Sequence, residues 1–401
     1  MHRILAFRLV LVTTLMLIAI PFPSRLGADT GTCGGASITL PFTDVSASGF
    51  FCQIAQAYFS GLTNGTSATN YSPAANVTRE QMAAFVTRTM DQALKRGSRR
   101  TGLKRFWTPT SPNGLGFTTV GSAPLGVESD GVDLWVANYV SGTVSRVRAG
   151  DGKLLEAWTG AETPTDVLAA NGLIFVAGSS STNGIVYQGI LYQLDPRQPA
   201  GAVTMLTNSV QGIPTGIAFD GERIWTSNSF DGRAAVSIIT LNPVGVTNIF
   251  AGSQANGILY DGANMWVVVG SNLYKLNSSG AIIQTVSVNA EGISAPAFDG
   301  TNIWVPNRAP NSVSVVRAST GTVLATLTGN GLDRPLAAVF DGERMLITNP
   351  SGNSVSLWKA SDLSPLGSVS TGGLFTSPFR ACSDGLNFWI TLKDSNQLTR
   401  F

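Results

Sequence analysis

The chain has 401 residues, of which 12% are charged and 44 are glycine, and its formal net charge is +2. This charge is too small to predict a nucleic-acid partner, because proteins that bind nucleic acid concentrate Lys and Arg against the phosphates. The length allows two or three domains, and the many glycines are typical of a β protein rich in turns.

The first 28 residues predict a signal peptide. Basic residues come first, an apolar stretch runs from Leu9 to Ile20, and helix breakers lead to a small residue, Ala28. This order is typical of a secretory leader, and the apolar core is too short for a good membrane span. We therefore expect an exported protein at the cell envelope, on its surface or its periplasmic side, with no transmembrane segment after cleavage.

Three cysteines follow the leader. Cys33 and Cys52 could form a disulfide in an oxidising compartment, or they could remain two buried thiols. Cys382 is the odd one, and it lies on a predicted innermost strand, where we expect a buried and inert thiol.

Residues 29–96 predict a small helical domain. The first helix carries an apolar stripe and ends at Gly61, a natural left-handed stop; the stripe consists of Phe51, Ile54, Ala55, Tyr58 and Phe59. The second helix opens with a capping box, in which the Thr78 hydroxyl caps the first turn and Gln81 reaches back. Its apolar face consists of Met82, Phe85, Val86, Ala93 and Leu94.

This region resembles the S-layer homology domain. The matching motifs, in the family's order, are "FTDV", "GLTNGTSATNYSP" and "NVTREQMAAFVTR". The resemblance implies attachment to the cell envelope through a wall glycan or peptidoglycan, and it implies a binding site at Asp44, Gly61, Gly65, Thr78 and Arg79.

Arg79 takes the position of the family's ligand-contacting arginine. Its planar guanidinium suits carboxylates and phosphates, and a helix N-terminus favours an anion. The alternative is that Arg79 pairs with a neighbouring carboxylate. The family commonly has three tandem copies and this chain has one, so the chain self-associates, is anchored weakly, or uses the module for another purpose.

Residues 97–114 are basic and then rich in Pro and Ser, which predicts a linker. A solvated tether explains this composition. Contact of the basic run with an anionic polymer or with lipid headgroups is the alternative.

Residues 115–401 contain a repeat of about 41 residues. An Asp-Gly or Asn-Gly turn followed by an apolar run recurs at spacings of 41, 49, 41, 38, 42 and 43 residues; the seven copies begin at Asp130, Asn171, Asp220, Asp261, Asp299, Asp341 and Asp384. Each unit reads as four short strands, which is the signature of a propeller blade. We predict a mainly β fold with a seven-bladed propeller; six blades would follow if the second unit were irregular.

The two ends of this region predict how the ring closes. The last unit lacks a fourth strand, and an unassigned run, Leu115 to Gly121, precedes the first unit. Pairing that run with the chain's last strand would complete the last blade and remove an exposed sheet edge.

The ring resembles secreted propellers with YVTN repeats, NHL repeats or streptogramin-lyase-like blades, on motifs such as "LWVAN", "IWTSN" and "IWVPN". The lyase branch depends on a histidine, and this chain has only His2, inside the leader. Ser-His-Asp and Cys-His catalysis and His-ligated metals are therefore excluded from the mature protein.

Sugar-lactone hydrolase relatives of this group use Glu, Asn and Asp around calcium in the channel. Four recurring asparagines could face a channel mouth, although we expect a turn conformation at these strand ends; they are Asn138, Asn228, Asn307 and Asn349. The recurring Trp residues share their position with Phe175 and Leu346, which favours packing between blades.

Two interpretations follow. The first is a non-enzymatic envelope protein whose propeller binds a protein or glycan and needs no cofactor. The second is a calcium-dependent lactonase-like enzyme, or another hydrolase that works with carboxylates alone. Glu128 and Asp166 are the clearest acidic residues on predicted innermost strands. Two carboxylates from adjacent blades are a weak basis for a metal site, so the first interpretation is preferred.

Overall fold

The structure is a computed structural model. It describes residues 28–59, 62–94, 116–182, 186–230, 233–252, 255–289, 292 and 294–401. The predicted linker and all but the last residue of the predicted signal peptide lie outside these ranges. Among the described residues, no helix is long and apolar enough to cross a membrane.

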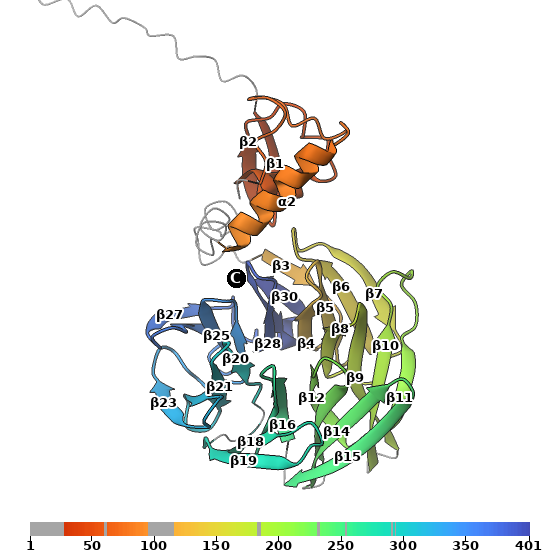
Figure 1. The fold of residues 1–401 in the computed structure, drawn as a ribbon, viewed down its shortest axis with the longest axis vertical. Coiled ribbons are helices and arrows are strands. Elements are labelled where there is room, and N and C mark those ends of the chain that lie inside the picture. Colours follow the sequence, from red (N-terminus) through yellow and green to blue (C-terminus); the bar gives the residue numbers. More distant parts are fainter. Residues whose placement is uncertain are drawn as a thin grey trace, which may run out of the picture.

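The N-terminal module combines a β-hairpin with two helices (Figure 1). The elements are β1 (Asp29–Cys33), β2 (Ala36–Leu40), α1 (Phe51–Phe59) and α2 (Arg79–Leu94). The sequence predicted both helices and missed the hairpin. In the structure Cys33 and Cys52 form a disulfide, which joins β1 to α1.

The apolar stripe of α1 is confirmed, since Phe51, Ile54 and Ala55 are buried in the module's core. The capping box of α2 is also confirmed: the N–H of Gln81 donates to Thr78 Oγ1 at 3.2 Å, and the N–H of Thr78 donates to Gln81 Oε1 at 2.9 Å. The apolar face of α2 differs from expectation, because Met82 and Val86 are 52% and 61% exposed.

The described residues of the C-terminal region form seven four-stranded antiparallel sheets around one axis, which confirms the seven-bladed propeller (Figure 1). Blade 1 consists of β4 (Pro124–Ser129), β5 (Asp133–Asn138), β6 (Thr143–Arg148) and β7 (Leu154–Thr159). Blade 2 consists of β8 (Asp166–Ala170), β9 (Leu173–Thr182), β10 (Val186–Leu194) and β11 (Thr204–Gln211). Blade 3 consists of β12 (Ile213–Phe219), β13 (Ile224–Phe230), β14 (Arg233–Leu241) and β15 (Val244–Gly252).

Blade 4 consists of β16 (Ala255–Tyr260), β17 (Met265–Val269), β18 (Asn272–Leu276) and β19 (Ile282–Ser287). Blade 5 consists of β20 (Ala297–Phe298), β21 (Asn302–Asn307), β22 (Ser312–Arg317) and β23 (Val323–Thr328). Blade 6 consists of β24 (Ala338–Phe340), β25 (Arg344–Asn349), β26 (Ser354–Lys359) and β27 (Pro365–Ser370). Blade 7 consists of β28 (Pro378–Ser383), β29 (Phe388–Leu392), β30 (Gln397–Arg400) and, from the start of the region, β3 (Gly116–Thr119), with a short 3₁₀ helix (Lys393–Ser395) before β30.

The ring closes as predicted. Strand β3 pairs antiparallel with β30, with Phe117 opposite Thr399 and Thr118 opposite Leu398. The innermost strand of blade 7, β28, contacts the innermost strand of blade 1, β4. The irregular second unit is a full blade with two long strands, β9 and β10, so six blades are excluded.

In five blades the Asp of the recurring Asp-Gly turn binds both its turn and its blade's tryptophan; Asp341 differs, because its unit has Leu346 at the tryptophan position. In blade 5, Asp299 Oδ1 accepts the N–H groups of Thr301 and Asn302, while Asp299 Oδ2 accepts the indole N–H of Trp304. The same pair, at 2.7 to 2.8 Å, occurs in five blades: Asp130–Trp135, Asp220–Trp225, Asp261–Trp266, Asp299–Trp304 and Asp384–Trp389. These indoles are at most 1% exposed, which confirms that they pack in the core.

Candidate functional site

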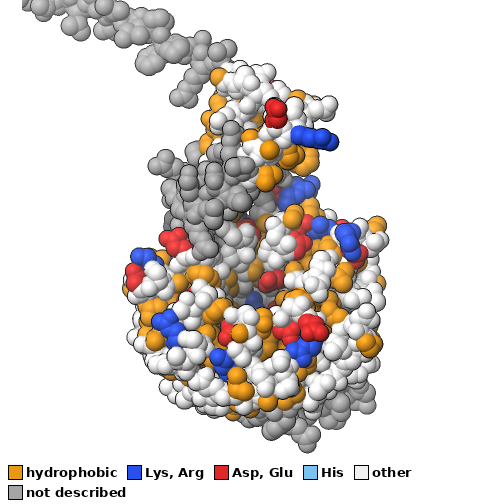
Figure 2. Space-filling view, in the orientation of Figure 1, with side chains coloured by type: hydrophobic (Ala, Val, Ile, Leu, Met, Phe, Trp, Pro, Cys, Tyr) orange, Lys and Arg blue, Asp and Glu red, His pale blue; other side chains and the backbone are white. Residues whose placement is uncertain are grey.

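The innermost strands enclose a cavity of about 350 Å³ along the axis of the propeller. Blades 5 and 6 line one side with small and apolar residues, among them Ala295, Ala297 and Ala338. Blades 7, 1 and 2 supply the three charged side chains of this lining, Arg380, Glu128 and Asp166. The face of the ring in Figure 2 is otherwise mostly uncharged. The cavity therefore has an apolar side and a charged side.

Glu128, on β4, faces this cavity without a partner. In the described part of the chain its carboxyl makes no hydrogen bond or ion pair, although some of its surface reaches the cavity. Its depth among protein atoms raises the pKa of Glu128 to about 8, first through desolvation and then through the charge of Asp166. Glu128 is therefore mainly protonated at neutral pH.

Asp166, at the start of β8, is 7% exposed and has several partners. Burial raises the pKa of its carboxyl, while the charge of Arg380 and the N–H groups of Val167 and Ile217 act in the opposite direction. Arg380 Nη1 lies 3.5 Å from Asp166 Oδ2, and Arg380 Nη2 donates to the carbonyl oxygen of Thr215. The guanidinium thus bridges blades 2, 3 and 7.

Cys382 lies two residues after Arg380 on β28 and also lines the cavity. It is buried, as predicted, and burial raises the pKa of its thiol, with smaller contributions from the charges of Glu128 and Asp384. A protonated thiol is a poor nucleophile, so inertness remains the expectation for Cys382.

The sequence pointed to Glu128 and Asp166 and missed Arg380. Alignment of the seven units on their Asp-Gly or Asn-Gly turns would have revealed it. Four residues before the turn the other units have Gly, Val or Ala, and the last unit has Arg380. Two residues before the turn, Glu128 is likewise the one charged residue of the seven. A charged side chain in a position filled elsewhere by small or apolar residues is the signal.

A glycine makes room for the charged cluster. A Cβ at Gly126 would lie 2.5 Å from Asp166 Oδ1 and 2.6 Å from Asp166 Cα. Because a backbone atom cannot move away cheaply, Gly126→Ala should lower the free energy of unfolding by about 1–3 kcal/mol in urea titrations. Gly150→Ala is the control, since a Cβ there meets nothing within 4 Å. Equal stability of the two variants would contradict this packing.

The recurring asparagines do not adopt the predicted turn conformation. Three of them end an extended strand, and Asn228 lies inside β13, two residues before its end. All four are buried, and each amide donates to a serine of the next strand: Asn138 to Ser145, Asn228 to Ser237, Asn307 to Ser314 and Asn349 to Ser356. The described residues contain no group of three or more His, Cys, Asp and Glu side chains placed to hold a metal ion. Nothing here adds support to a calcium site.

The predicted wall-binding residues of the module have mixed surroundings. Asp44 accepts the N–H groups of Tyr71 and Ser72, at 2.9 and 2.7 Å, so its carboxylate orders the loop. Gly65 has a positive φ of 80°, and a Cβ there would collide with Phe42. Thr78 caps α2, and Gly61 lies outside the described residues. Arg79 is exposed at the first residue of α2 and forms no ion pair with another described residue.

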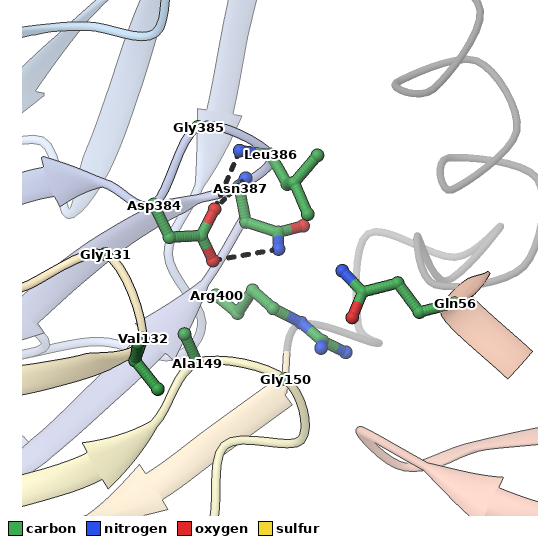
Figure 3. A pocket seen from close by; sticks show the side chains of 10 residues that line it. All are labelled: Gln56, Gly131, Val132, Ala149, Gly150, Asp384, Gly385, Leu386, Asn387 and Arg400. Carbon is green, nitrogen blue, oxygen red and sulfur yellow. Dashed lines mark hydrogen bonds between the residues drawn. The ribbon is translucent and has the colours of Figure 1, made fainter. Parts of the chain in front are cut away.

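The module touches the propeller beside blades 7 and 1. Leu386 packs against the module's core, and Arg400 Nη2 donates to the carbonyl oxygen of Gly34 at 3.4 Å. A polar pocket of about 280 Å³ lies at this junction, with Gln56 on the module's side and Arg400 on the propeller's side (Figure 3). Asp384, which also lines it, is occupied by its own turn and by Trp389.

Comparisons with known proteins agree with this architecture. Residues 41–83 match the S-layer homology domain. No curated protein matches the chain. Virginiamycin B lyase from Staphylococcus aureus has a similar structure, with a TM-score of 0.58 and 15% identity over 71% of this chain and 98% of the lyase. Hydrazine synthase from Kuenenia stuttgartiensis has a TM-score of 0.57 and 17% identity over 71% of this chain and 97% of that one.

These structural similarities concern the fold. A variant of the S. aureus lyase in which one histidine is replaced by alanine is catalytically inactive, and its structure contains quinupristin. The chain described here has a single histidine, His2. The family match and the sheet topology together show that the chain contains an S-layer homology domain, typical of cell-surface proteins, followed by a seven-bladed propeller.

Proposed function

We propose that this protein is exported and is held at the cell envelope by its S-layer homology module, which binds a wall glycan or peptidoglycan. The match at residues 41–83 carries this proposal. The exposed side chain of Arg79 at the N-terminus of α2 supports it, because a guanidinium at a helix N-terminus attracts an anionic polymer.

The propeller, in this proposal, is a scaffold that binds a partner held near the wall. The residues that recur in its blades have structural roles, since the Asp and Trp side chains bind each other and the Asn side chains bind Ser. The cavity on the axis has charged residues that do not recur, which makes it the better candidate for binding. No observation favours the calcium-dependent hydrolase over this scaffold.

Retention of the full mature chain on purified cell-wall sacculi tests the anchor. Arg79→Ala should lower retention by about tenfold or more, because a charge-assisted hydrogen bond contributes roughly 1.5–3 kcal/mol. The retention of Arg79→Lys should lie between that of the parent and that of Arg79→Ala, because lysine keeps the charge and lacks the planar guanidinium. Arg197→Ala removes an exposed arginine of the propeller and should bind like the parent.

Two outcomes would contradict the proposal in different ways. Undiminished retention of Arg79→Ala would remove the role of Arg79 while leaving the anchor intact. Failure of the parent chain to bind sacculi would remove the anchor itself. Thermal melts of all variants should coincide, since Arg79 is exposed and contributes little to the folded core.

A further inference from the structure

The cavity on the propeller axis has the size of a small-molecule site. Its volume of about 350 Å³ lies in the range of ligand pockets, and three charged side chains converge on it. Its charged groups lie on the innermost strands of three different blades: β4 of blade 1, β8 of blade 2 and β28 of blade 7. They come together because the ring is closed. No repeated structural role accounts for them.

The charged side of the cavity has more acidic than basic side chains. Two carboxyls, Glu128 and Asp166, face one guanidinium, that of Arg380. The Nη atoms of Arg380 are engaged by Asp166 and by the carbonyl of Thr215, while its buried Nε has no hydrogen-bond partner among the described residues. The carboxyl of Glu128 has no hydrogen bond or ion pair with a described residue. A half-buried polar group without a hydrogen bond to the protein carries a free-energy penalty that a ligand can remove.

We propose that this cavity binds a small cationic amine, with the ammonium group against Glu128 and an apolar body against the alanines of blades 5 and 6. The inference deepens the scaffold part of the proposed function and is independent of the wall anchor. An ammonium donates three hydrogen bonds and stabilises the ionised carboxylate. An anionic ligand would instead meet Asp166 and the ionised form of Glu128.

Binding should be coupled to ionisation of Glu128. The titratable groups that face Glu128 are Asp166 on β8 and Arg380 and Cys382 on β28. The pKa of Glu128 is raised to about 8, so below pH 8 the amine must displace a proton. Its affinity should therefore rise by up to tenfold per pH unit from pH 6 and level off above pH 8.

Calorimetry on the full mature chain tests this with three probes of one length: n-hexylammonium, hexanoate and 1-hexanol. Hexylammonium should bind at least tenfold more tightly than either of the others at pH 8. An alkylamine of this kind stays protonated there, as lysine does with a pKa near 10.4. Titrations in two buffers of different ionisation enthalpy should show nearly one proton released at pH 6 and almost none at pH 9.

The apolar side of the cavity makes a second, independent prediction. Affinity should fall from hexylammonium to butylammonium to ethylammonium by roughly fourfold per methylene, as burial of about 0.8 kcal/mol per CH₂ requires. A series with no dependence on chain length would overturn the assignment of the apolar body to blades 5 and 6.

Glu128→Gln has the same shape and cannot ionise. It should lower hexylammonium affinity at pH 8 at least tenfold and abolish both the pH dependence and the proton release. Glu222→Gln, which changes an exposed turn, should behave like the parent. Hexanoate or hexanol binding as tightly as hexylammonium, or a Glu128→Gln variant that keeps the pH dependence, would overturn the proposal. Absence of hexylammonium binding at millimolar concentration would overturn it as well.

Discussion

Replacing Asp299 by alanine should lower the free energy of unfolding by about 3–5 kcal/mol. The carboxylate accepts four hydrogen bonds: from the backbone N–H groups of Thr301 and Asn302, from the side-chain amide of Asn302 and from the indole N–H of Trp304. Trp304 is completely buried, so its N–H would lose its partner without gaining water. Each buried donor left unsatisfied costs about 1–3 kcal/mol. Chemical denaturation followed by tryptophan fluorescence measures the loss.

The chain itself supplies a control for this prediction. Blade 2 has Asn171 in place of the turn aspartate and Phe175 in place of the tryptophan, so both halves of the pair are absent together. Asp299→Asn combined with Trp304→Phe copies that blade. The double variant should be about 1–2 kcal/mol more stable than the sum of the single losses predicts, because neither group is then left unpaired.

Two results would speak against this account. One is a loss below about 1 kcal/mol for Asp299→Ala, which would mean that solvent or a neighbour replaces the carboxylate. The other is strict additivity of Asp299→Asn and Trp304→Phe, which would mean that the two side chains do not interact.

The repeat predicted the blades, the turns and the ring closure because each depends on local pattern. Asp-Gly turns between apolar runs specify hairpins, and the missing fourth strand of the last unit pointed to residues 115–121. The Asp–Trp hydrogen bond was not predicted, although the two residues recur five positions apart. The sequence does not show that the hairpin brings the indole N–H back to the turn.

The contacts within the charged cluster could not be predicted from local sequence pattern. Glu128 and Asp166 were found on innermost strands, but their distance depends on how adjacent blades pack and on the space left at Gly126. Arg380 reaches Asp166 because blades 7, 1 and 2 are neighbours in a closed ring, and a register shift between Pro378 and Ala381 disturbs β28 beside it. Periodicity cannot predict a contact made by residues that break the repeat.

The predicted burial of the apolar face of α2 was wrong for a different reason. The helical spacing of Met82 and Val86 is correct, yet spacing alone does not say that a second surface is present to cover them. In the described structure both side chains are more than half exposed. The apolar stripe therefore predicted the helix correctly, but it predicted more buried side chains than the structure has.

Stability should fall as the pH rises from about 4.5 to about 8, because the half-buried Glu128 must ionise. Its pKa is raised from the ordinary value of 4.5 to about 8, so in this window the folded chain binds more protons than the unfolded chain. The contribution is fully present below pH 4.5 and is lost as the pH passes 8. A pKa difference of this size corresponds to at most about 5 kcal/mol, and water in the cavity reduces it to a few kcal/mol.

Glu128→Gln isolates this effect from other titrating groups. Burial also raises the pKa of Asp166 and of Cys382, so the parent curve alone contains several contributions. The difference between parent and Glu128→Gln should be small at pH 4.5 and should reach a few kcal/mol in favour of the variant at pH 9. Glu222→Gln should follow the parent, and a parent curve that stays level between pH 5 and pH 8 would contradict the half-buried, unpaired state of Glu128.

The stability curve and the amine affinity must then have one midpoint, since both titrate the same carboxyl. A cation that binds ionised Glu128 should restore, at pH 8 to 9, part of the stability that ionisation removes, by mass action on the folded state. Hexylammonium should therefore raise the unfolding midpoint of the parent at pH 9 and leave that of Glu128→Gln almost unchanged. Equal shifts of the unfolding midpoint in the parent and in Glu128→Gln would mean that the amine does not bind the Glu128 carboxyl and binds another part of the surface.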